Sequence, residues 1–236
     1  MDMWMRVLVC ILFLLFSLYV GHLFLVQMKA SNELTEYKNH LQKMVENRTR
    51  ELETKNELLE MEVFIRKKTE EELQYLAITD PLTHLYNRRK FYELLNIEIQ
   101  RERRYKTGLA LILCDLDHFK TINDHFGHDV GDSVIKIFSH TAKENIRETD
   151  ILARWGGEEF IFLIPATNLD NALAIAEKLR AATEEIKLPP VGRITASFGV
   201  TQFCDGDQEE SFIKRADDAL YMAKKKSRNC VEVLLK

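Results

Sequence analysis

Apolar and polar positions divide the N-terminal part of the chain into two segments. Residues 7 to 26 form an apolar run without Asp, Glu, Lys or Arg, and its length matches a helix that crosses the hydrocarbon core of a bilayer. Residues 30 to 76 contain no Gly or Pro and are dense in Glu, Lys, Leu and Arg, which favours one long helix. The pattern therefore predicts a transmembrane helix within residues 1–29 and a second helical segment over residues 30–77.

The charges around the apolar run predict its orientation. Arg6 is the only Lys or Arg before the run, whereas five basic residues follow it closely: Lys29, Lys38, Lys43, Arg48 and Arg50. By the positive-inside rule the bulk of the chain lies in the cytoplasm, held at the inner membrane by a single span. A cleaved signal peptide is the alternative, but the run is long for one and no clear small-x-small cleavage site follows it.

The segment over residues 30–77 carries a partial heptad repeat. One series with seven-residue spacing is mostly apolar, with Arg66 as its exception: Val45, Leu52, Leu59 and Leu73. A companion series is polar in its middle and apolar only at Leu34, Leu41 and Leu76. This is the pattern of a weak coiled coil. A solvated single helix is the alternative; because a membrane anchor raises the local concentration, we predict a parallel homodimer.

The stretch "DILARWGGEEFIFLIP" predicts a β-hairpin. Two apolar-rich segments are separated by Gly156 and Gly157, which readily adopt positive φ in a two-residue turn. This register places Trp155 opposite Glu158 and Arg154 opposite Glu159. The second segment is apolar at successive positions, so we expect a central strand that is buried on both faces. Arg154 and Glu159 then form a cross-strand ion pair, or else the bare glycines let a ligand approach the backbone.

A second acidic strand end lies upstream of the hairpin. Residues 109 to 114 are a continuous apolar run that ends in Asp115, and a helix is expected to start near Asp132. If this strand and the hairpin lie side by side, Asp115 and Glu158 converge. Two carboxylates repel each other unless a cation lies between them, and the preference of hard cations for oxygen indicates Mg²⁺, with Mn²⁺ as the alternative ion.

Composition excludes some other classes of function. The chain has 236 residues and a formal net charge of −4, without the basic balance expected of a protein that binds duplex nucleic acid. Its four cysteines are far apart and show no CxxC spacing, which indicates a reducing compartment and no zinc site. His125 and His128 are better interpreted as turn or surface residues than as metal ligands. The basic end of the helix "RADDALYMAKKKSRN" either interacts with the helix dipole or binds phosphate.

Five motifs together resemble a known family. "DPLTHLYNRR", "DLDHFKTINDHFGHDVGD", "RWGGEEF", "SFGV" and "RADDALYMAKKKSRN" closely resemble the GGDEF domain of bacterial diguanylate cyclases in its GGEEF form. They occur in the order and at the spacings of that family over about residues 78–236. The resemblance implies an α/β fold with a central, mostly antiparallel sheet flanked by helices, like the palm of nucleotide cyclases and polymerases.

The resemblance also implies roles for individual residues. Asp115, the backbone carbonyl of Leu116 and Glu158 would bind the metal ion, and Lys120 would stabilise charge on the phosphates. Either Glu158 or Glu159 would activate the ribose 3′-hydroxyl. Asn123 and Asp132 would bind the guanine edge, with His128 near the nucleotide. Gly156 and Gly157 would let the nucleotide approach the hairpin, and Lys224 and Arg228 would bind the terminal phosphates.

The implied reaction condenses two GTP into cyclic di-GMP and two diphosphates. One domain binds one GTP, so two domains must face each other, and the predicted helical dimer would bring them together. An inactive domain that serves as a cyclic di-GMP receptor or scaffold is the alternative, against which the intact Asp115, Lys120, Glu158 and Glu159 argue. A cyclase that also accepts ATP is a third hypothesis, with Asn123 and Asp132 as the evidence against it.

Product inhibition by cyclic di-GMP is a further expectation. Arg147 and Asp150 in "RETD" stand before the Gly-Gly pair at the spacing of the family's inhibition motif. The family's full site also takes an arginine from the following helix, where this chain has Lys178. Lysine keeps the charge but loses the planar fork of arginine, so we expect weaker inhibition. A surface ion pair between Arg147 and Asp150 is the alternative.

Overall fold

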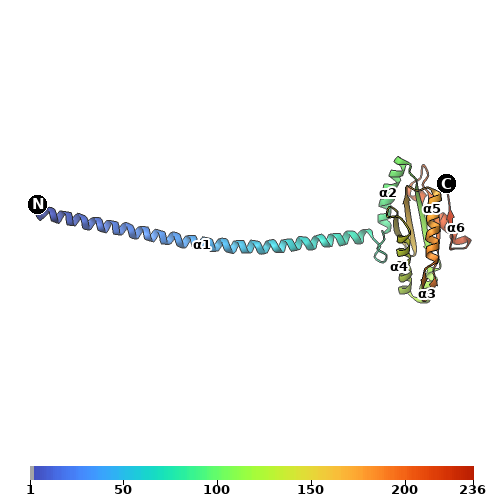
Figure 1. Ribbon diagram of the computed structural model, residues 1–236, viewed down its shortest axis with the longest axis horizontal. Coiled ribbons are helices and arrows are strands. Elements are labelled where there is room, and N and C mark those ends of the chain that lie inside the picture. The colour runs from blue at the N-terminus through green and yellow to red at the C-terminus, as the bar shows by residue number, and fades with distance from the viewer. Residues whose placement is uncertain (1–2) are drawn as a thin grey trace. The chain divides into compact units, whose positions relative to one another are not determined.

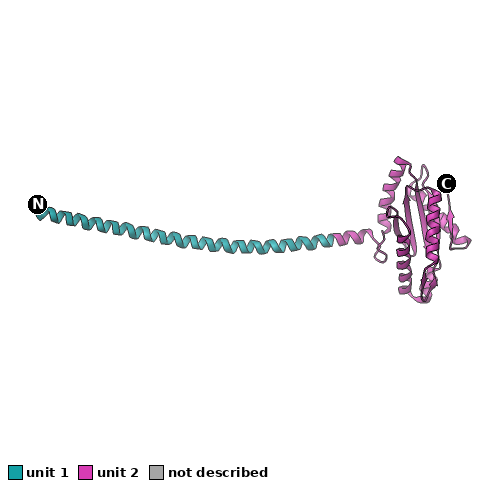
Figure 2. Cartoon of the chain, in the orientation of Figure 1, with its two compact units in different colours: residues 1–70 teal, residues 71–236 magenta. Residues whose placement is uncertain are grey.

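The computed structural model describes residues 3–236. The first two residues of the predicted N-terminal segment therefore lie outside the described residues. The chain divides into two compact units, residues 1–70 and residues 71–236, which are coloured separately in Figure 2.

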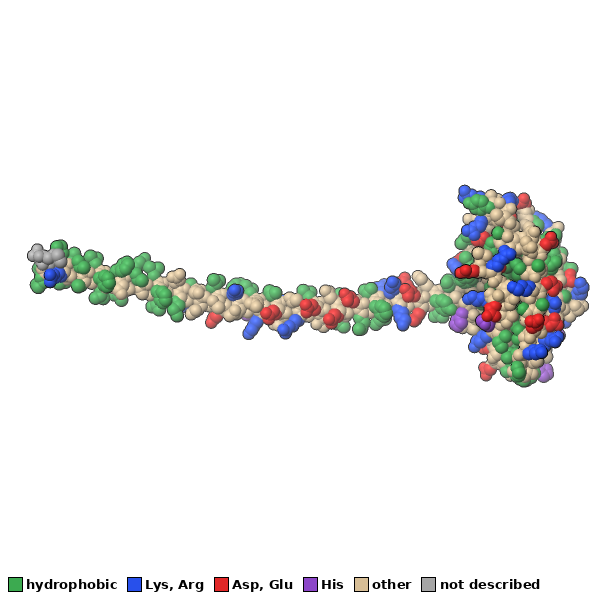
Figure 3. All heavy atoms as spheres, viewed as in Figure 1, with side chains coloured by type: hydrophobic (Ala, Val, Ile, Leu, Met, Phe, Trp, Pro, Cys, Tyr) green, Lys and Arg blue, Asp and Glu red, His purple; other side chains and the backbone are tan. Residues whose placement is uncertain are grey.

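The N-terminal unit is helical throughout its described length. Helix α1 (Met3–Ile78) continues past it into the second unit, and none of its side chains is buried. Apolar side chains predominate near its N-terminus, and acidic and basic ones are interspersed further along (Figure 3). By length and composition the helix could cross a membrane. A signal sequence near an N-terminus meets the same criteria of length and composition. The helix predicted over residues 30–77 is present, without a break from the apolar segment before it.

The second unit is built on a five-stranded mixed sheet. Its strand order is β2 (Ile151–Gly156), β3 (Glu159–Pro165), β1 (Leu109–Leu116), β6 (Ala196–Gln202) and β7 (Val231–Val233). All neighbours pair antiparallel except β6 and β7, which are parallel. A separate two-stranded sheet joins β4 (Lys187–Leu188) and β5 (Gly192–Arg193). The predicted mostly antiparallel sheet is thus present, with β1 at its centre.

Helices cover both faces of this sheet (Figure 1). Ala110, Ile112 and Cys114 of β1 belong to a core cluster with residues of α3 (Phe119–Phe126), α4 (His128–Glu144) and α5 (Leu169–Glu184). The alternate residues of β1 belong to a second cluster with α2 (Arg88–Tyr105) and α6 (Glu209–Lys226). Because successive strand side chains point to opposite faces, a strand between two layers of helices is apolar at every position.

Close approach of α6 to the sheet requires one particular glycine. A Cβ on Gly199 of β6 would lie 2.2 Å from the Leu220 backbone nitrogen and 2.3 Å from the Ala216 carbonyl oxygen. Both atoms are helix backbone, which cannot move aside without separating α6 from the sheet. The "SFGV" motif therefore marks the point at which helix and strand backbones touch.

Two predictions about local structure are wrong by a few residues. Gly156 pairs with Glu159, so the hairpin turn consists of Gly157 and Glu158, and Trp155 does not lie opposite Glu158. The cause is a register shift between Arg154 and Gly156, since a bulge adds one residue to one strand only. The helix expected to start near Asp132 begins earlier, at His128, directly after Gly127 with φ 85°.

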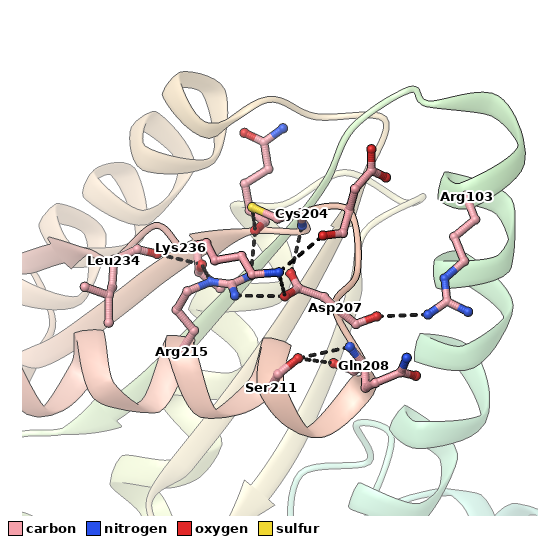
Figure 4. A network of polar contacts seen from close by, with 11 residues as sticks. Arg103, Cys204, Asp207, Gln208, Ser211, Arg215, Leu234 and Lys236 are labelled. Atoms are coloured by element: carbon pink, nitrogen blue, oxygen red, sulfur yellow. Dashed lines mark hydrogen bonds and ion pairs between the residues drawn. The ribbon is translucent and has the colours of Figure 1, made fainter.

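A buried ion pair fixes α6 to the end of β6 (Figure 4). The Arg215 guanidinium donates to the Asp207 carboxylate (Nη1 to Oδ1, 3.1 Å), to Thr201 Oγ1 (2.7 Å) and to the Gln202 carbonyl (2.9 Å). Arg103 of α2 donates to the Asp207 carbonyl at 2.9 Å. Asp207 is 1% exposed and Arg215 is 9% exposed. The network therefore joins α2, α6 and the sheet through groups that cannot be hydrated separately.

We expect Asp207→Ala to lower the free energy of unfolding by about 3–5 kcal/mol, because it leaves the Arg215 guanidinium buried without a counter-charge. The matched control is Asp205→Ala, which removes a solvent-exposed ion pair with Lys106 and should cost less than about 1 kcal/mol. Urea unfolding of the detergent-solubilised chain, followed by near-UV circular dichroism, measures both. Equal losses in the two variants would contradict the assigned role of the buried pair.

The difference in stability between wild type and Asp207→Ala should depend on pH. Burial raises the pKa of Asp207, but hydrogen bonds from Arg215 and from the Cys204 backbone outweigh it and lower the pKa below the ordinary value of 3.8. A carboxyl whose pKa is lowered by folding stabilises the fold above its unfolded pKa. The advantage of wild type over Asp207→Ala should therefore be full above about pH 4 and shrink as the pH falls further.

Candidate active site

Two acidic segments meet at one end of the sheet. Asp115, near the end of β1, pairs in register with Glu159 at the start of β3. The backbone N–H of Leu116 donates to the carbonyl of Glu158 at 3.3 Å. The expected convergence of Asp115 with the hairpin is thus present, and Glu158 lies in the turn beside it. Strand pairing, rather than a contact between side chains, brings these groups together.

The electrostatics of this meeting point favour a cation. Asp115 is 8% exposed, and burial, together with Glu158 and Glu159, raises its pKa to about 6 against the opposing effect of Lys224. The Lys224 ammonium of α6 lies 2.7 Å from Asp115 Oδ2. An ammonium group therefore already neutralises part of the local negative charge. Burial is the largest cause of the raised pKa, and the two glutamates add to it.

Arg154 fixes the tip of the hairpin. Its Nε and Nη2 donate to the Gly157 carbonyl at 3.0 and 2.7 Å, and its Nη1 donates to both oxygens of Asp80 at 3.0 and 3.1 Å. The interpretation of Arg154 and Glu159 as an ion pair is therefore wrong, because the bulge turns Arg154 towards the loop after α1. Asp80 also accepts from Thr83 Oγ1 at 2.8 Å.

The role of Asp80 was missed by sequence reasoning. "DPLT" was recognised as a motif, but nothing local pairs it with an arginine 74 positions away. Burial raises the pKa of Asp80, and bonds from Thr83 and Arg154 outweigh this effect and lower it. Asp80 thus stays ionised and links the chain segment just after α1 to the hairpin turn.

The two glycines of the hairpin have different surroundings. A Cβ on Gly156 would lie 3.3 Å from Glu159 Oε2, whereas a Cβ on Gly157 would meet nothing within 4 Å. Gly157 therefore faces open space at the tip, beside Glu158. The approach of a ligand to the Gly156–Gly157 pair stays a prediction.

Asn123 lies over a glycine on the neighbouring helix. A Cβ on Gly131 would be only 1.9 Å from Asn123 Oδ1 and 3.2 Å from the Phe119 ring, so the missing side chain makes room for Asn123. Asn123 Oδ1 is buried without a hydrogen-bond partner. Asp132, next to Gly131, is exposed. An unpartnered buried acceptor is unfavourable, so this amide is a group that a hydrogen-bond donor would stabilise.

The remaining predicted residues lie on the surface around this end of the sheet. Lys120 of α3, His128 at the start of α4 and Arg228 after α6 are exposed. His125 is also exposed, with Nδ1 2.9 Å from the Thr121 carbonyl, in keeping with its interpretation as a surface residue. Within residues 3–236, no three His, Cys, Asp or Glu side chains are clustered for metal binding. A metal ion here would depend on two carboxylates and a backbone oxygen.

The "RETD" segment forms a tight turn. The Arg147 backbone N–H donates to Asp150 Oδ2 at 2.9 Å, and the Asp150 N–H donates to the Arg147 carbonyl at 3.1 Å. Asp150 is 8% exposed, and its Oδ1 has no partner. Burial raises the pKa of this carboxyl despite Arg147. A surface ion pair is therefore the wrong interpretation, because the carboxylate is buried and bonded to the backbone of Arg147.

A cavity lies beside this turn. It has a volume of about 540 Å³ and is lined by Arg147 and Asp150 together with Tyr75, His84 and Tyr86 among others. Lys178 of α5 lies behind the turn, where its Nζ donates to the Asn145 carbonyl at 3.2 Å. The structure thus brings the three predicted inhibition-site residues to one region, where Arg147 and Asp150 line the cavity and Lys178 contacts the segment just before the turn.

Comparison with known proteins agrees with this geometry. The family model described as "Diguanylate cyclase, GGDEF domain" matches residues 77–230. The chain belongs to the GGDEF family. Diguanylate cyclase DgcP of Pseudomonas aeruginosa is 43% identical over 167 residues, which cover 69% of this chain and 25% of DgcP. Diguanylate cyclase DgcM of Escherichia coli is 39% identical over 70% of this chain and 40% of its own length. The chain thus spans less than half the length of these curated relatives.

Solved structures of GGDEF domains show the same fold. The coiled coil and GGDEF domain of DgcB from Caulobacter crescentus, in complex with c-di-GMP, superposes with a TM-score of 0.73 at 30% identity. The match covers 78% of this chain and 99% of that one. The resemblance drawn from the five motifs is therefore confirmed. Diguanylate cyclases of this family need a divalent metal ion, and the oxygen atoms around Asp115 and Glu158 are of the type that hard cations prefer.

Proposed function

We propose that this chain is a diguanylate cyclase that condenses two GTP into cyclic di-GMP and two diphosphates. The observation that carries the proposal is the pairing of Asp115 with Glu159, which brings Asp115 to the hairpin turn that holds Glu158. The Lys224 ammonium of α6 lies 2.7 Å from the same carboxylate. The names of DgcP and DgcM as diguanylate cyclases support the same reaction. A receptor or scaffold without activity would not need this set of charges intact.

Asp115, Glu158 and the Leu116 carbonyl would hold Mg²⁺, or Mn²⁺ in its place. The ion would supply charge neutralisation at the reacting phosphate when bound. Either Glu158 or Glu159 would accept the proton of the ribose 3′-hydroxyl as it attacks the α-phosphate. Glu158 lies in the turn and Glu159 in the strand, so the two candidates differ in freedom of movement. The raised pKa of Asp115 is consistent with a group that awaits a cation.

Basic residues would bind the phosphates. Lys120 would stabilise charge on the phosphates, and Lys224 and Arg228 would hold the terminal ones. Lys224 contacts Asp115, and a cation bound by Asp115 would release the ammonium for substrate phosphate. Charge-assisted contacts of this kind orient the leaving diphosphate for an in-line displacement.

The base would be recognised by residues of α3 and α4. Guanine carries N–H donors at positions of its base-pairing edge where adenine has none. The Asp132 carboxylate and the unpartnered Asn123 Oδ1 are acceptors that suit such donors. His128 would lie near the nucleotide, and Gly156 and Gly157 would let it approach the hairpin. A site that offers acceptors to the base discriminates against a ligand that leaves them unpaired, so GTP would be favoured over ATP.

We expect Glu158→Ala to reduce cyclic di-GMP synthesis by at least about 100-fold, because it removes a metal ligand from a half-buried turn outside the core. Glu185→Ala, at an exposed position after α5, is the matched control and should leave the rate unchanged. The measurement is formation of cyclic di-GMP from labelled GTP with Mg²⁺, alongside ATP as a competing substrate. Near-normal synthesis by Glu158→Ala would refute the metal assignment, and no synthesis by wild type would refute the function.

Membrane attachment and dimer formation are the proposed tasks of α1. Every described side chain of α1 before residue 77 is exposed, including the apolar run at residues 7–26, which lipid would cover. The heptad positions Leu52, Leu59 and Leu73 are likewise exposed and available to a second copy. One domain presents one nucleotide site, so both bonds of the product require two domains face to face. The catalytic domain would lie in the cytoplasm, at the inner membrane.

Two truncations separate these tasks. A chain without residues 1–28 should leave the membrane fraction but keep its activity per subunit, because the heptad segment remains. A chain without residues 1–70 retains the second compact unit and should be largely monomeric, with activity per subunit that rises with protein concentration. Fractionation, light scattering and initial rates over a concentration series measure these outcomes. Activity independent of concentration in the shorter chain would contradict the dimer requirement.

Product inhibition is the third part of the proposal. Arg147 offers a planar fork for phosphate or a guanine edge, and the unpartnered oxygen of Asp150 can accept from guanine nitrogens. The adjacent cavity, with Tyr75 and Tyr86 in its lining, provides aromatic surface for a base. Lys178 would add a positive charge from α5. Cyclic di-GMP is therefore proposed as inhibitor as well as product.

We expect Arg147→Ala to abolish inhibition by added cyclic di-GMP, and Lys178→Arg to lower the inhibitory concentration several-fold, since a fork replaces a point charge. Lys214→Arg, on the exposed side of α6, is the control for the lysine change and should have no effect. Initial rates against added product provide the measurement. Equal inhibition of wild type and Arg147→Ala would show that this turn is not the inhibitory site.

A further inference from the structure

Asp117 is a buried carboxylate just beyond the acidic end of β1. It is 5% exposed and accepts three hydrogen bonds, from Ser197 Oγ (2.7 Å), Thr195 Oγ1 (2.8 Å) and the backbone N–H of Asn229 (2.9 Å). Its own N–H donates to the Thr195 carbonyl at 2.9 Å. None of the roles proposed above uses this side chain, although it lies two positions from Asp115.

The bond to Asn229 reaches the turn that follows α6. Arg228 and Asn229 both have left-handed backbone conformations, with φ of 56° and 45°. Two such residues in succession are unfavourable for side chains with a Cβ, so surrounding contacts must hold them. The Arg228 N–H donates to the Ala223 carbonyl at 3.1 Å, and Asn229 Oδ1 accepts from Arg180 at 3.0 Å. The carboxylate of Asp117 supplies a charged acceptor at the second of the two strained residues.

The end of α6 is thus attached to β1 at two points of different kinds. Lys224 contacts Asp115 through its side chain, and that contact must break if the ammonium is to move to a phosphate. Asp117 bonds to the backbone of Asn229, and that contact does not depend on where the Lys224 and Arg228 side chains point. The second attachment therefore persists while the first one changes partner.

We propose that Asp117 is a positioning residue for phosphate binding. It fixes the backbone of the Arg228–Asn229 turn against β1, so that Lys224 and Arg228 remain beside the carboxylates of Asp115 and Glu158. A carboxylate suits this task because its two oxygens can accept from two hydroxyls and an N–H at once, whereas an amide has only one acceptor oxygen. The inference rests on the proposed function, in which Lys224 and Arg228 bind the terminal phosphates of GTP.

A double-mutant cycle on the full chain tests this role. We expect Asp117→Ala to raise the KM for GTP by roughly tenfold with a smaller change in kcat, because charged groups that bind phosphate lose their alignment. Arg228→Ala should raise KM to a similar extent. If Asp117 acts through the turn, the double variant should be little worse than either single one, since residues in one unit are not additive. Binding of a non-hydrolysable GTP analogue provides a second readout that does not require turnover.

Two further variants separate positioning from general stability. Thr195→Val removes one hydroxyl bond to Asp117 but keeps the bond to Asn229, so it should lower the unfolding temperature without raising KM. Asp117→Asn retains one acceptor oxygen, should give an intermediate KM, and replaces Asp117→Ala in the cycle if the alanine variant does not fold.

The outcomes distinguish this inference from the proposal on which it rests. Effects of Asp117→Ala and Arg228→Ala that multiply, or a KM raised equally by Thr195→Val, would overturn the positioning role. An unchanged KM and analogue affinity in Arg228→Ala would overturn the phosphate role of Arg228, and with it the route by which Asp117 acts. A wild type that binds the analogue but forms no cyclic di-GMP would overturn the proposed reaction while the binding cycle still decides the role of Asp117.

Discussion

Pairing of β1 with its two neighbours is the constraint on which the rest of the second unit depends. The register with β3 places Asp115 opposite Glu159, and the register with β6 places the same residue opposite Ser197. A shift by one residue would turn the apolar side chains of β1 to the wrong faces and separate the acidic groups. The two helical layers therefore fix the register through burial, and the register in turn fixes the acidic site.

Concentrating negative charge at a buried strand end is unfavourable by itself. Burial, with a smaller contribution from two neighbouring glutamates, raises the pKa of Asp115 to about 6, so positive charge nearby helps to keep this carboxyl ionised. Lys224 provides part of that help from α6, and a bound cation would provide more. Carboxylates that repel one another attract a metal ion and an ammonium group. These positive charges in turn make the site suitable for binding phosphates.

Polar contacts between residues far apart in the sequence hold the loops around the acidic site. Arg154 ties the hairpin turn to Asp80, directly after α1, and Asn87 donates to the carbonyl of Ala77 at 2.9 Å within the last turn of α1. The loop after α1 and the hairpin tip therefore share one chain of contacts. Each of these side chains is held by two or more hydrogen bonds, which fixes the hairpin turn relative to the chain segment after α1.

Much of the fold could be predicted from the residues because it depends on local periodicity. Three segments each have a pattern that only one type of element satisfies: the continuous apolar run of β1, the Gly-free segment at residues 30–76 and the apolar segment at residues 7–26. Five motifs in register then identified the family and the acidic residues. The convergence of Asp115 and Glu158 followed from placing two recognised strands side by side.

Other features were decided only in three dimensions. The bulge at Arg154 depends on a single extra residue that no periodicity marks, and it redirects Arg154 from Glu159 to Asp80. The bond from Asp117 joins residues separated by 112 positions, and the Asp207–Arg215 pair matters because both groups are buried. Sequence patterns report which side of an element is apolar, since that is a local property. Which buried polar groups become partners depends on how distant segments pack, because each partner is determined by the cost of leaving a group unpaired at its place in the fold.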